Sequence, residues 1–170
     1  MEGKELDLLI QKVAAGDNAA LERLYRETAR GVYSFAYSFL SNHQDTEDVL
    51  QSSFLLIKQK AYTYRRGTNA RAWMLQIVKN LALDELRRRK RRGEVELDER
   101  SGVLSPDEGS SALDYMMSKL SSEEREIVVL HVYWGYKHRE IAGMLHLPPG
   151  TVSWKYSAAI KKLEAFREDV

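Results

Sequence analysis

Residues 138–155 read HREIAGMLHLPPGTVSWK, and this stretch decides the fold of the C-terminal third of the chain. Apolar residues three and four positions apart on each side of a tight turn predict two short helices. Ile141, Ala142 and Leu145 would face inward from the first of them. Pro148 and Pro149 suit the start of the second, where a missing N–H costs nothing. The spacing predicts a helix-turn-helix.

The second helix, continued to about residue 167, predicts one apolar and one polar face at 100° per residue. The apolar face is expected in the core and comprises Val152, Tyr156, Ala159, Ile160, Leu163 and Phe166. A helix in the major groove reads base edges from its first turns, while cations hold phosphates. We therefore predict base contacts from Thr151, Trp154, Lys155 and Ser157, with Lys161 and Lys162 nearer the DNA backbone.

The same residues also fit a solvated surface, with the three lysines in water and Trp154 packed on a neighbouring helix. An exposed indole opposite a complete apolar face is unusual unless it meets DNA or a partner. Trp154 is therefore the most informative residue of this helix.

The remainder of the chain has helical spacing throughout, and its 3 prolines leave long uninterrupted stretches. We predict helices from Leu6 to Gly16, from Asp17 to Leu40, from Asp45 to Ala61 and from Asn69 to Arg92, with Asp17, Asp45 and Asn69 as N-terminal caps. Further helices are expected at 112–120, 122–133, 137–145 and 149–167. The predicted fold class is all-α, in two small helical domains.

The distribution of charge along the chain indicates the domain boundaries, which the length of the chain alone does not. Residues 1–93 carry a net charge of about +6, residues 94–112 about −5, and residues 113–170 about zero. Glu, Asp, Gly, Ser and Pro dominate from Gly93 to Ser111, which predicts a flexible acidic linker. The expected organisation is a domain at 1–93, a linker at 94–111 and a helix-turn-helix domain at 112–170.

A second candidate surface lies on the helix from Asn69 and the loop before it. Gln76, Asn80, Leu83 and Arg87 follow one strip of that helix, with Asp84 beside it, and the loop carries Tyr62, Tyr64, Arg65, Arg66 and Asn69. Amides, aromatic rings and cations together are what unstacked single-stranded bases require. The basic run from Arg87 to Arg92 also fits a helix end stabilised by the macrodipole alone.

Two groups of motifs resemble the extracytoplasmic-function sigma factors of the sigma-70 family. DTEDVLQSSF at 45–54 and RAWMLQIVKNLALDELRRR at 71–89 resemble their second conserved domain. LSSEEREIVVL at 120–130, continued through Glu140-Ile-Ala, Gly150-Thr-Val and Lys161-Lys-Leu, is similar to their fourth domain. The two groups occur in the family's order over nearly the whole chain.

The resemblance implies a protein that binds core RNA polymerase, recognises a promoter and opens it, without catalysing a reaction. Glu47, Asp48, Gln51 and Phe54 would dock on the β′ clamp helices. The loop, with Gln76, Lys79, Asn80 and Asp84, would capture the −10 strand, and the helix-turn-helix would read the −35 element and lean on the β flap. The acidic linker would thread toward the active-site channel. An anti-sigma factor is a further partner that the resemblance implies.

Some positions depart from the family's pattern. Ser153, which we include among the −35 contacts, stands where a basic residue is common, as do Ala158 and Ile160. Each lost cation lowers phosphate affinity. His146 replaces a turn glycine and Lys137 a capping Ser or Thr, so a strained or altered turn is expected.

Two other classes of function remain open from the residues. One is a helix-turn-helix regulator whose N-terminal half senses a ligand or a partner; it would not bind core polymerase. The other is a metal-dependent enzyme using Glu47 and Asp48, or Glu123, Glu124 and Glu126, although acidic residues near helix starts are expected for capping.

The chain has no cysteine, and its histidines lack metal-ligand spacing, so we expect no metal and no cofactor. The four histidines are His43, His131, His138 and His146. Without a signal sequence or an apolar span, a cytoplasmic protein that does not insert into membranes is expected.

Overall fold

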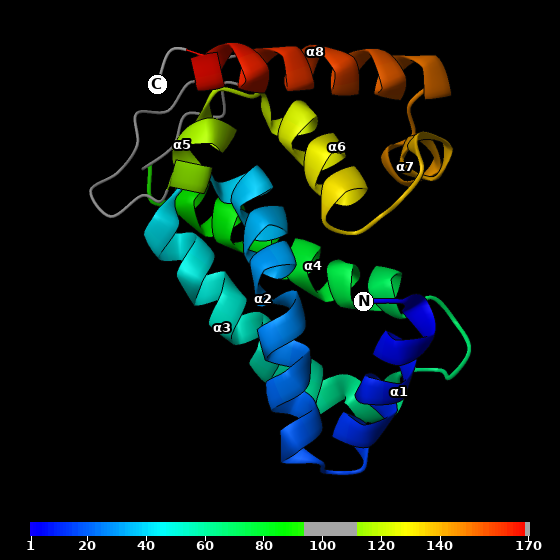
Figure 1. Ribbon diagram of the computed structural model, residues 1–170. Coiled ribbons are helices and arrows are strands. Elements are labelled where there is room, and N and C mark those ends of the chain that lie inside the picture. Colours follow the sequence, from blue (N-terminus) through cyan, green and yellow to red (C-terminus); the bar gives the residue numbers. More distant parts are fainter. Residues whose placement is uncertain (94–111, 169–170) are drawn as a thin grey trace.

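The structure is a computed structural model that describes residues 1–93 and 112–168. Every regular element within these ranges is helical, so the predicted all-α fold is confirmed. The predicted linker at 94–111 lies outside the described residues. None of the helices described is long and apolar enough to cross a bilayer. The elements are α1 (Gly3–Ala14), α2 (Asn18–Leu40), α3 (His43–Lys60), the 3-10 helix η1 (Ala61–Thr63), α4 (Ala70–Arg91), α5 (Ala112–Ser118), α6 (Ser122–Val132), α7 (His138–Leu145) and α8 (Pro149–Glu168) (Figure 1).

Polar side chains determine where the first helices begin. Asp17 and Asn69 each accept a hydrogen bond at 3.0 Å from the backbone N–H three residues further on, as predicted. The prediction that Asp45 caps α3 is wrong, because Asn42 accepts from the Asp45 backbone N–H at 2.9 Å and the helix begins at His43. Asn and Asp cap about equally well, and the sequence offers both three residues apart.

The N-terminal module comprises α1 to α4, with α2 running through its middle (Figure 1). Its core draws a fully buried side chain from every helix: Ile10, Leu24, Phe35, Ile57 and Met74. Burying side chains of this size stabilises a fold by about 1.5–3 kcal/mol each. This core sets the rotation of α3 and α4, and therefore which of their residues face solvent.

The C-terminal module comprises α5 to α8. Of the residues that the sequence placed inward on α7 and α8, four are buried: Ile141, Ala142, Val152 and Ala159. The others are only half-buried, namely Leu145, Tyr156, Ile160, Leu163 and Phe166. Leu120, just before α6, and Ile127 and Leu130 of α6 complete the core. The predicted helix-turn-helix is present as α7 and α8.

The two modules pack directly on each other along a contact that we call the seam, where α6 lies beside α2 (Figure 1). The indole N–H of Trp134, a 6% exposed residue, donates to the Gly31 carbonyl at 3.2 Å. Ser122 and Arg125 both donate to the Ser38 carbonyl, at 3.1 and 3.3 Å. The sequence predicted two helical modules, but it did not predict that they dock.

Helix α5 is tied to the N-terminal module through a buried carboxylate. The Tyr33 hydroxyl donates to Asp114 at 2.9 Å, and His43 Nδ1 lies 3.4 Å from the same carboxylate. Burial raises the pKa of the Tyr33 hydroxyl, and the hydrogen bond to Asp114 raises it further. The Tyr37 hydroxyl donates to the Asp114 carbonyl at 3.2 Å. These bonds place the start of the C-terminal module against α2 and α3.

Candidate nucleic-acid interface

The turn between α7 and α8 uses a left-handed residue that is not glycine. His146 has φ 55° and ψ 41°, as expected from its place in the turn. The Leu147 backbone N–H donates to the Ala142 carbonyl at 3.0 Å and closes the turn. No side chain caps α7, but the Glu140 carboxylate accepts from the Lys137 backbone N–H at 2.7 Å. The altered turn therefore still presents α8 as a second helix.

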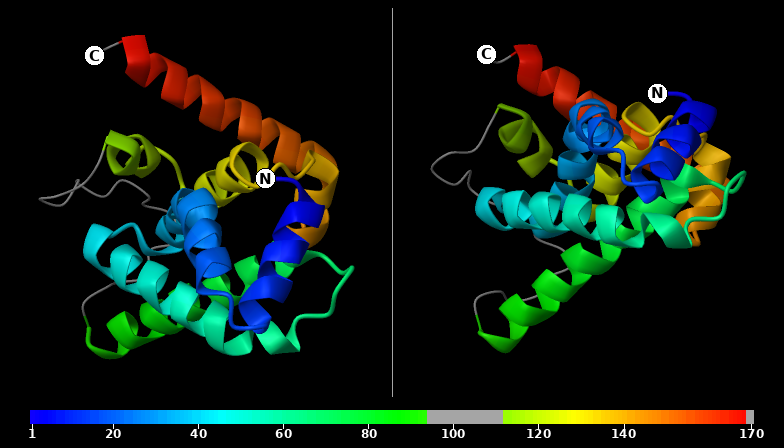
Figure 2. Two further views of the ribbon diagram at one scale, coloured as in Figure 1. Left: turned by 60° about the horizontal axis from the view of Figure 1, so that its bottom comes forward. Right: turned by 90° about the horizontal axis from the view of Figure 1, so that it is seen from below.

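The outer face of α8 matches the predicted polar face. Figure 1 and the left view of Figure 2 place α8 at an edge of the molecule. Trp154 exposes 70% of its surface, while Val152 and Ala159 on the other side expose none. Ser153, Ser157 and Lys161 are exposed beside the indole, and Thr151 is half-buried. An exposed ring among small polar side chains can meet the edges of DNA bases.

Two of the three lysines on α8 form ion pairs with α6. Lys155 Nζ lies 2.5 Å from Glu123, and Lys162 Nζ lies 2.8 Å from Glu124. Burial acts to raise the pKa of Glu124, but hydrogen bonds from Lys162 and from the Ser121 backbone hold it below its usual value. Lys161 has no ion pair with the described residues. The sequence could not show these pairs, because the partners come from another helix.

Ser153 is held by the helix before it. His138 Nδ1 lies 3.0 Å from the Ser153 hydroxyl oxygen. The His138 ring also packs on His131 and Tyr156, with ring centres 4.7 and 4.8 Å apart. Burial, and to a smaller extent His131, lower the pKa of His138. The side chain of Ser153, which stands where a basic residue is common in the family, is therefore held beside α7.

The predicted polar strip of α4 is on the surface. Gln76 donates to Asn80 at 2.8 Å, and both side chains are exposed. One turn further, Arg87 donates to the exposed Asp84 at 2.6 Å. Amide and charged groups therefore follow one another along the helix and remain accessible to an incoming base.

The segment from η1 to the start of α4 exposes a different aromatic ring, that of Tyr62 in η1, from the Tyr64 ring predicted as a −10 contact. Tyr62 is 79% exposed. The Tyr64 hydroxyl instead donates to Asp7 of α1 at 2.5 Å, and its ring packs on Trp73. This hydrogen bond, followed by that of the Gly67 backbone N–H, lowers the pKa of Asp7. Arg65, Arg66, Thr68 and Asn69 are exposed around this anchored loop.

Lys79 turns toward the seam and away from the polar strip. Its ammonium donates to Glu126 of α6 at 3.3 Å and lies 5.5 Å from the centre of the Phe39 ring. Burial raises the pKa of Glu126, and Lys79 opposes that rise. The structure therefore separates Lys79 from Gln76 and Asn80, with which the sequence grouped it.

The basic end of α4 is partly structural. Arg89 is 7% exposed, donates to the Leu40 carbonyl at 3.0 Å and contacts the Asp45 carboxylate. Arg88 and Arg92 pair with Glu85. Helical rotation explains the difference, because a run of six cations must turn some of them toward α2 and α3.

On α3 the four predicted polymerase contacts differ in exposure. Asp48 and Gln51 are exposed and Glu47 is half-buried, but Phe54 is 7% exposed and packs its ring edge-on against Tyr25, with centres 4.8 Å apart. Sequence reasoning missed Leu55, which is 60% exposed. It lies off the buried stripe of α3 and on the face of Asp48, and that position was the available signal.

Comparison with known proteins agrees with this geometry. The model of sigma-70 region 2 matches residues 24–92, and that of sigma-70 region 4 matches residues 110–163. The chain is 28% identical to the ECF RNA polymerase sigma factor SigL of Mycobacterium tuberculosis over 91% of this chain and 92% of SigL. It is 29% identical to SigM of the same organism, over 95% of this chain and 84% of SigM.

A solved structure shares the fold. The sigma factor RpoE of Bartonella quintana, in complex with the anti-sigma factor NepR, is 23% identical with a TM-score of 0.61, over 86% of this chain and 96% of RpoE. Two family regions in their usual order, on an all-helical chain whose second module is a helix-turn-helix, leave one assignment. The chain belongs to the extracytoplasmic-function (ECF) group of the sigma-70 family, the alternative sigma factors that direct transcription initiation.

Proposed function

We propose that the two modules divide promoter recognition between them. The N-terminal module would dock on the β′ clamp helices through Asp48, Gln51 and the newly found Leu55. The −10 strand would be held by the 62–69 loop and the strip formed by Gln76 and Asn80. The C-terminal module would read the −35 element through Trp154 and its exposed neighbours.

The observation that supports this proposal is that the most exposed aromatic side chain described on each module lies on the surface proposed to meet DNA. Tyr62 and Trp154 expose 79% and 70% of their surfaces, and each lies among exposed polar or charged side chains. Stacking on an aromatic ring stabilises a single-stranded base by about 1–3 kcal/mol, and an exposed ring on the second helix of a helix-turn-helix meets the major groove. A protein that used neither surface would gain nothing from leaving these rings in water.

The remaining roles follow from the same proposal. The domains are assigned to 1–93 and 112–170, and the protein would act by binding alone, in the cytoplasm with the chromosome and polymerase. An anti-sigma factor is proposed as a further partner, by analogy with the complex of RpoE and NepR. Such a partner would cover the same polymerase and DNA surfaces.

Reconstitution with core polymerase tests the proposal. Purified protein and core enzyme should form a holoenzyme that selects promoter fragments from a random pool. Gln76→Ala with Asn80→Ala should impair opening of a duplex promoter, seen as lower permanganate reactivity, more than it impairs use of a promoter with a pre-melted bubble. The reason is that these amides act on unpaired bases, so their loss matters most when strands must be separated.

Asn18→Ala is the control, because Asn18 is an exposed amide at the start of α2, outside both proposed surfaces. If no holoenzyme forms at moderate salt, the assignment of the α3 surface is wrong. If permanganate footprints are the same in the double variant and the wild type, the strip on α4 does not hold the −10 strand.

A further inference from the structure

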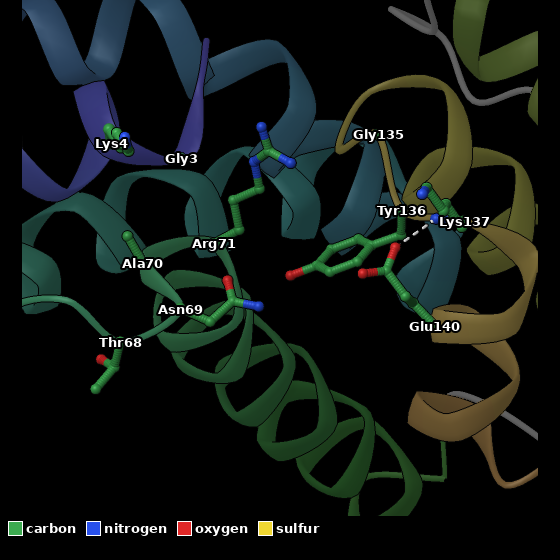
Figure 3. A pocket seen from close by; sticks show the side chains of 10 residues that line it. All are labelled: Gly3, Lys4, Thr68, Asn69, Ala70, Arg71, Gly135, Tyr136, Lys137 and Glu140. Carbon is green, nitrogen blue, oxygen red and sulfur yellow. Dashed lines mark hydrogen bonds between the residues drawn. The ribbon is translucent and has the colours of Figure 1, made fainter.

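A pocket of about 470 Å³ lies on the seam between the two modules (Figure 3). One side comes from the N-terminal module, at the beginning of α1 and of α4, and the other comes from the beginning of α7. This volume is within the range of sites that bind small molecules. Its polar and charged lining includes Lys4, Asn69, Arg71, Tyr136, Lys137 and Glu140.

The pocket is electropositive for two reasons. First, α1, α4 and α7 all begin at its wall, and each helix N-terminus carries a partial positive charge and backbone N–H groups. Second, Lys4, Arg71 and Lys137 add full charges. Among its described lining residues the one carboxylate is Glu140, which already accepts from the Lys137 backbone N–H at 2.7 Å. Positive charge therefore exceeds negative charge in the pocket lining, which favours binding of an anion.

Arg71 lies where the two modules meet. One guanidinium nitrogen donates to the Met1 carbonyl at 2.9 Å. Another lies 3.7 Å from the position that a Cβ atom on Gly135 would occupy, in the C-terminal module. A guanidinium has five N–H groups in a planar fork that matches phosphate oxygens, so donors remain for a ligand.

Tyr136 supplies an observation independent of charge. Its side chain is 5% exposed, yet its hydroxyl has no hydrogen-bond partner among the described residues. Figure 3 shows the hydroxyl directed toward Asn69 at the far side of the pocket. Burial raises the pKa of this hydroxyl, while the nearby Asn69 side chain and the charge of Arg71 oppose the rise. The contact with Asn69 lacks the geometry of a full hydrogen bond, so the hydroxyl can still donate to another acceptor. Buried hydroxyl groups are normally paired, so an acceptor from outside the chain would complete this one.

We propose that the pocket binds a small phosphate-bearing molecule. Arg71 and the Tyr136 hydroxyl would donate to its phosphate oxygens, and Lys4 and Lys137 would add attraction. Because both modules build the pocket, the ligand binds only when they are docked, and it therefore stabilises the docked arrangement. This binding goes beyond promoter recognition and can be measured without polymerase.

Isothermal titration calorimetry of the full-length protein at low salt tests the proposal with pyrophosphate, GTP and guanosine. Pyrophosphate and GTP should bind and should raise the Tm, and guanosine should do neither. Equal affinities for the two would indicate an inorganic or generic phosphate ligand, and tighter GTP binding would indicate a nucleotide. Absence of binding by both phosphate probes at about 1 mM would overturn the proposal.

Tyr136→Phe is the decisive variant, because it removes only the unpaired hydroxyl. We expect about tenfold weaker phosphate binding, the usual effect of losing a hydrogen bond to a charged group, and an unchanged or higher Tm without ligand. Arg71→Ala should weaken binding at least as much. Arg26→Ala, which removes an exposed cation on α2, should bind as the wild type does.

Two results would contradict the site. Wild-type affinity in both Tyr136→Phe and Arg71→Ala would place any binding elsewhere on the chain. Protection of the pocket by a short DNA duplex, with no effect of pyrophosphate or GTP, would make these residues part of the nucleic-acid surface instead.

Discussion

Trp154 combines a large apolar ring with 70% exposure on a helix whose Val152 and Ala159 are fully buried on the other side. We predict that Trp154→Ala lowers affinity for a −35 duplex by about tenfold, because aromatic anchors at the centre of an interface contribute most of its energy. Core-polymerase binding should be unchanged. The measurement is holoenzyme transcription and duplex binding with matched and scrambled −35 sequences.

Val132→Ala serves as the control, since Val132 is a 58% exposed apolar residue of α6 in the same module. It should not affect discrimination between the two −35 sequences. If the wild-type holoenzyme transcribes promoters with matched and scrambled −35 sequences equally, Trp154 does not recognise the −35 sequence.

His146 tests the cost of the non-glycine turn. Its left-handed conformation places a Cβ near the following carbonyl, which costs roughly 1–2 kcal/mol for an L-residue. His146→Gly removes that strain but adds freedom to the unfolded chain, so we predict a net gain of about 0.5–1 kcal/mol in the free energy of unfolding. Urea denaturation measures it. His146→Ala keeps the Cβ of this exposed residue and should leave stability near that of the wild type; an equal gain there would trace the effect to the imidazole.

Residue types predicted helix starts and the core better than they predicted the surface. Asp17 and Asn69 cap because capping depends on neighbours three residues away. Phe54 and Lys79 depart from the predicted surfaces because Tyr25 and Glu126, on other helices, engage them. A role that depends on a partner distant in sequence cannot be predicted from local spacing.

At the scale of elements, α6 contacts the N-terminal module and also restrains the recognition helix. Its buried residues face α2 on one side, and Glu123 and Glu124 hold Lys155 and Lys162 of α8 on another. These pairs compete with DNA phosphates for the two lysines. The eight predicted helices are all present in the described residues, but this competition depends on how α6 and α8 pack.

We therefore predict that Glu123→Gln strengthens DNA binding at low salt. Releasing Lys155 adds about one phosphate contact, so the slope of log affinity against log salt should become steeper by about 0.9. Fluorescence anisotropy of a −35 duplex over a range of salt concentrations measures both effects. Glu124 is left intact because its carboxylate also caps α6.

Glu164→Gln is the matched control: it removes the same charge from an exposed position on α8 without releasing a lysine. The two variants should differ in slope. Identical slopes would contradict the prediction. They would mean either that Lys155 already contacts DNA in the wild type despite its ion pair, or that it contacts DNA in neither protein.

In the whole molecule, the docked modules are too compact to bind the proposed −10 and −35 elements at the same time. A folded chain of this length has a radius of gyration of about 15 Å and so a diameter of about 40 Å. Elements centred near −10 and −35 lie roughly 25 base pairs apart, which is about 85 Å of duplex at 3.4 Å per pair. The seam must open before both surfaces can bind one promoter.

Gly31 offers a way to open it. A Cβ at this position would lie 3.3 Å from the Trp134 ring, closer than ordinary contact, so a larger side chain would push the indole out. We predict that Gly31→Leu separates the modules in the free protein and speeds association with core polymerase. Gly143→Leu, on a helix position with open space around it, is the control and should leave the modules docked.

The distance between the modules can be measured directly, because the chain has no native cysteine to compete for labels. Spin labels at Arg26→Cys on α2 and Glu164→Cys on α8 would report it by electron paramagnetic resonance. We expect one short distance in the free wild type, a longer and broader one in Gly31→Leu, and an increase of more than about 20 Å in the wild type bound to polymerase and promoter. The same short distance in the promoter complex would show that one docked molecule serves both elements, and the size argument would then be wrong.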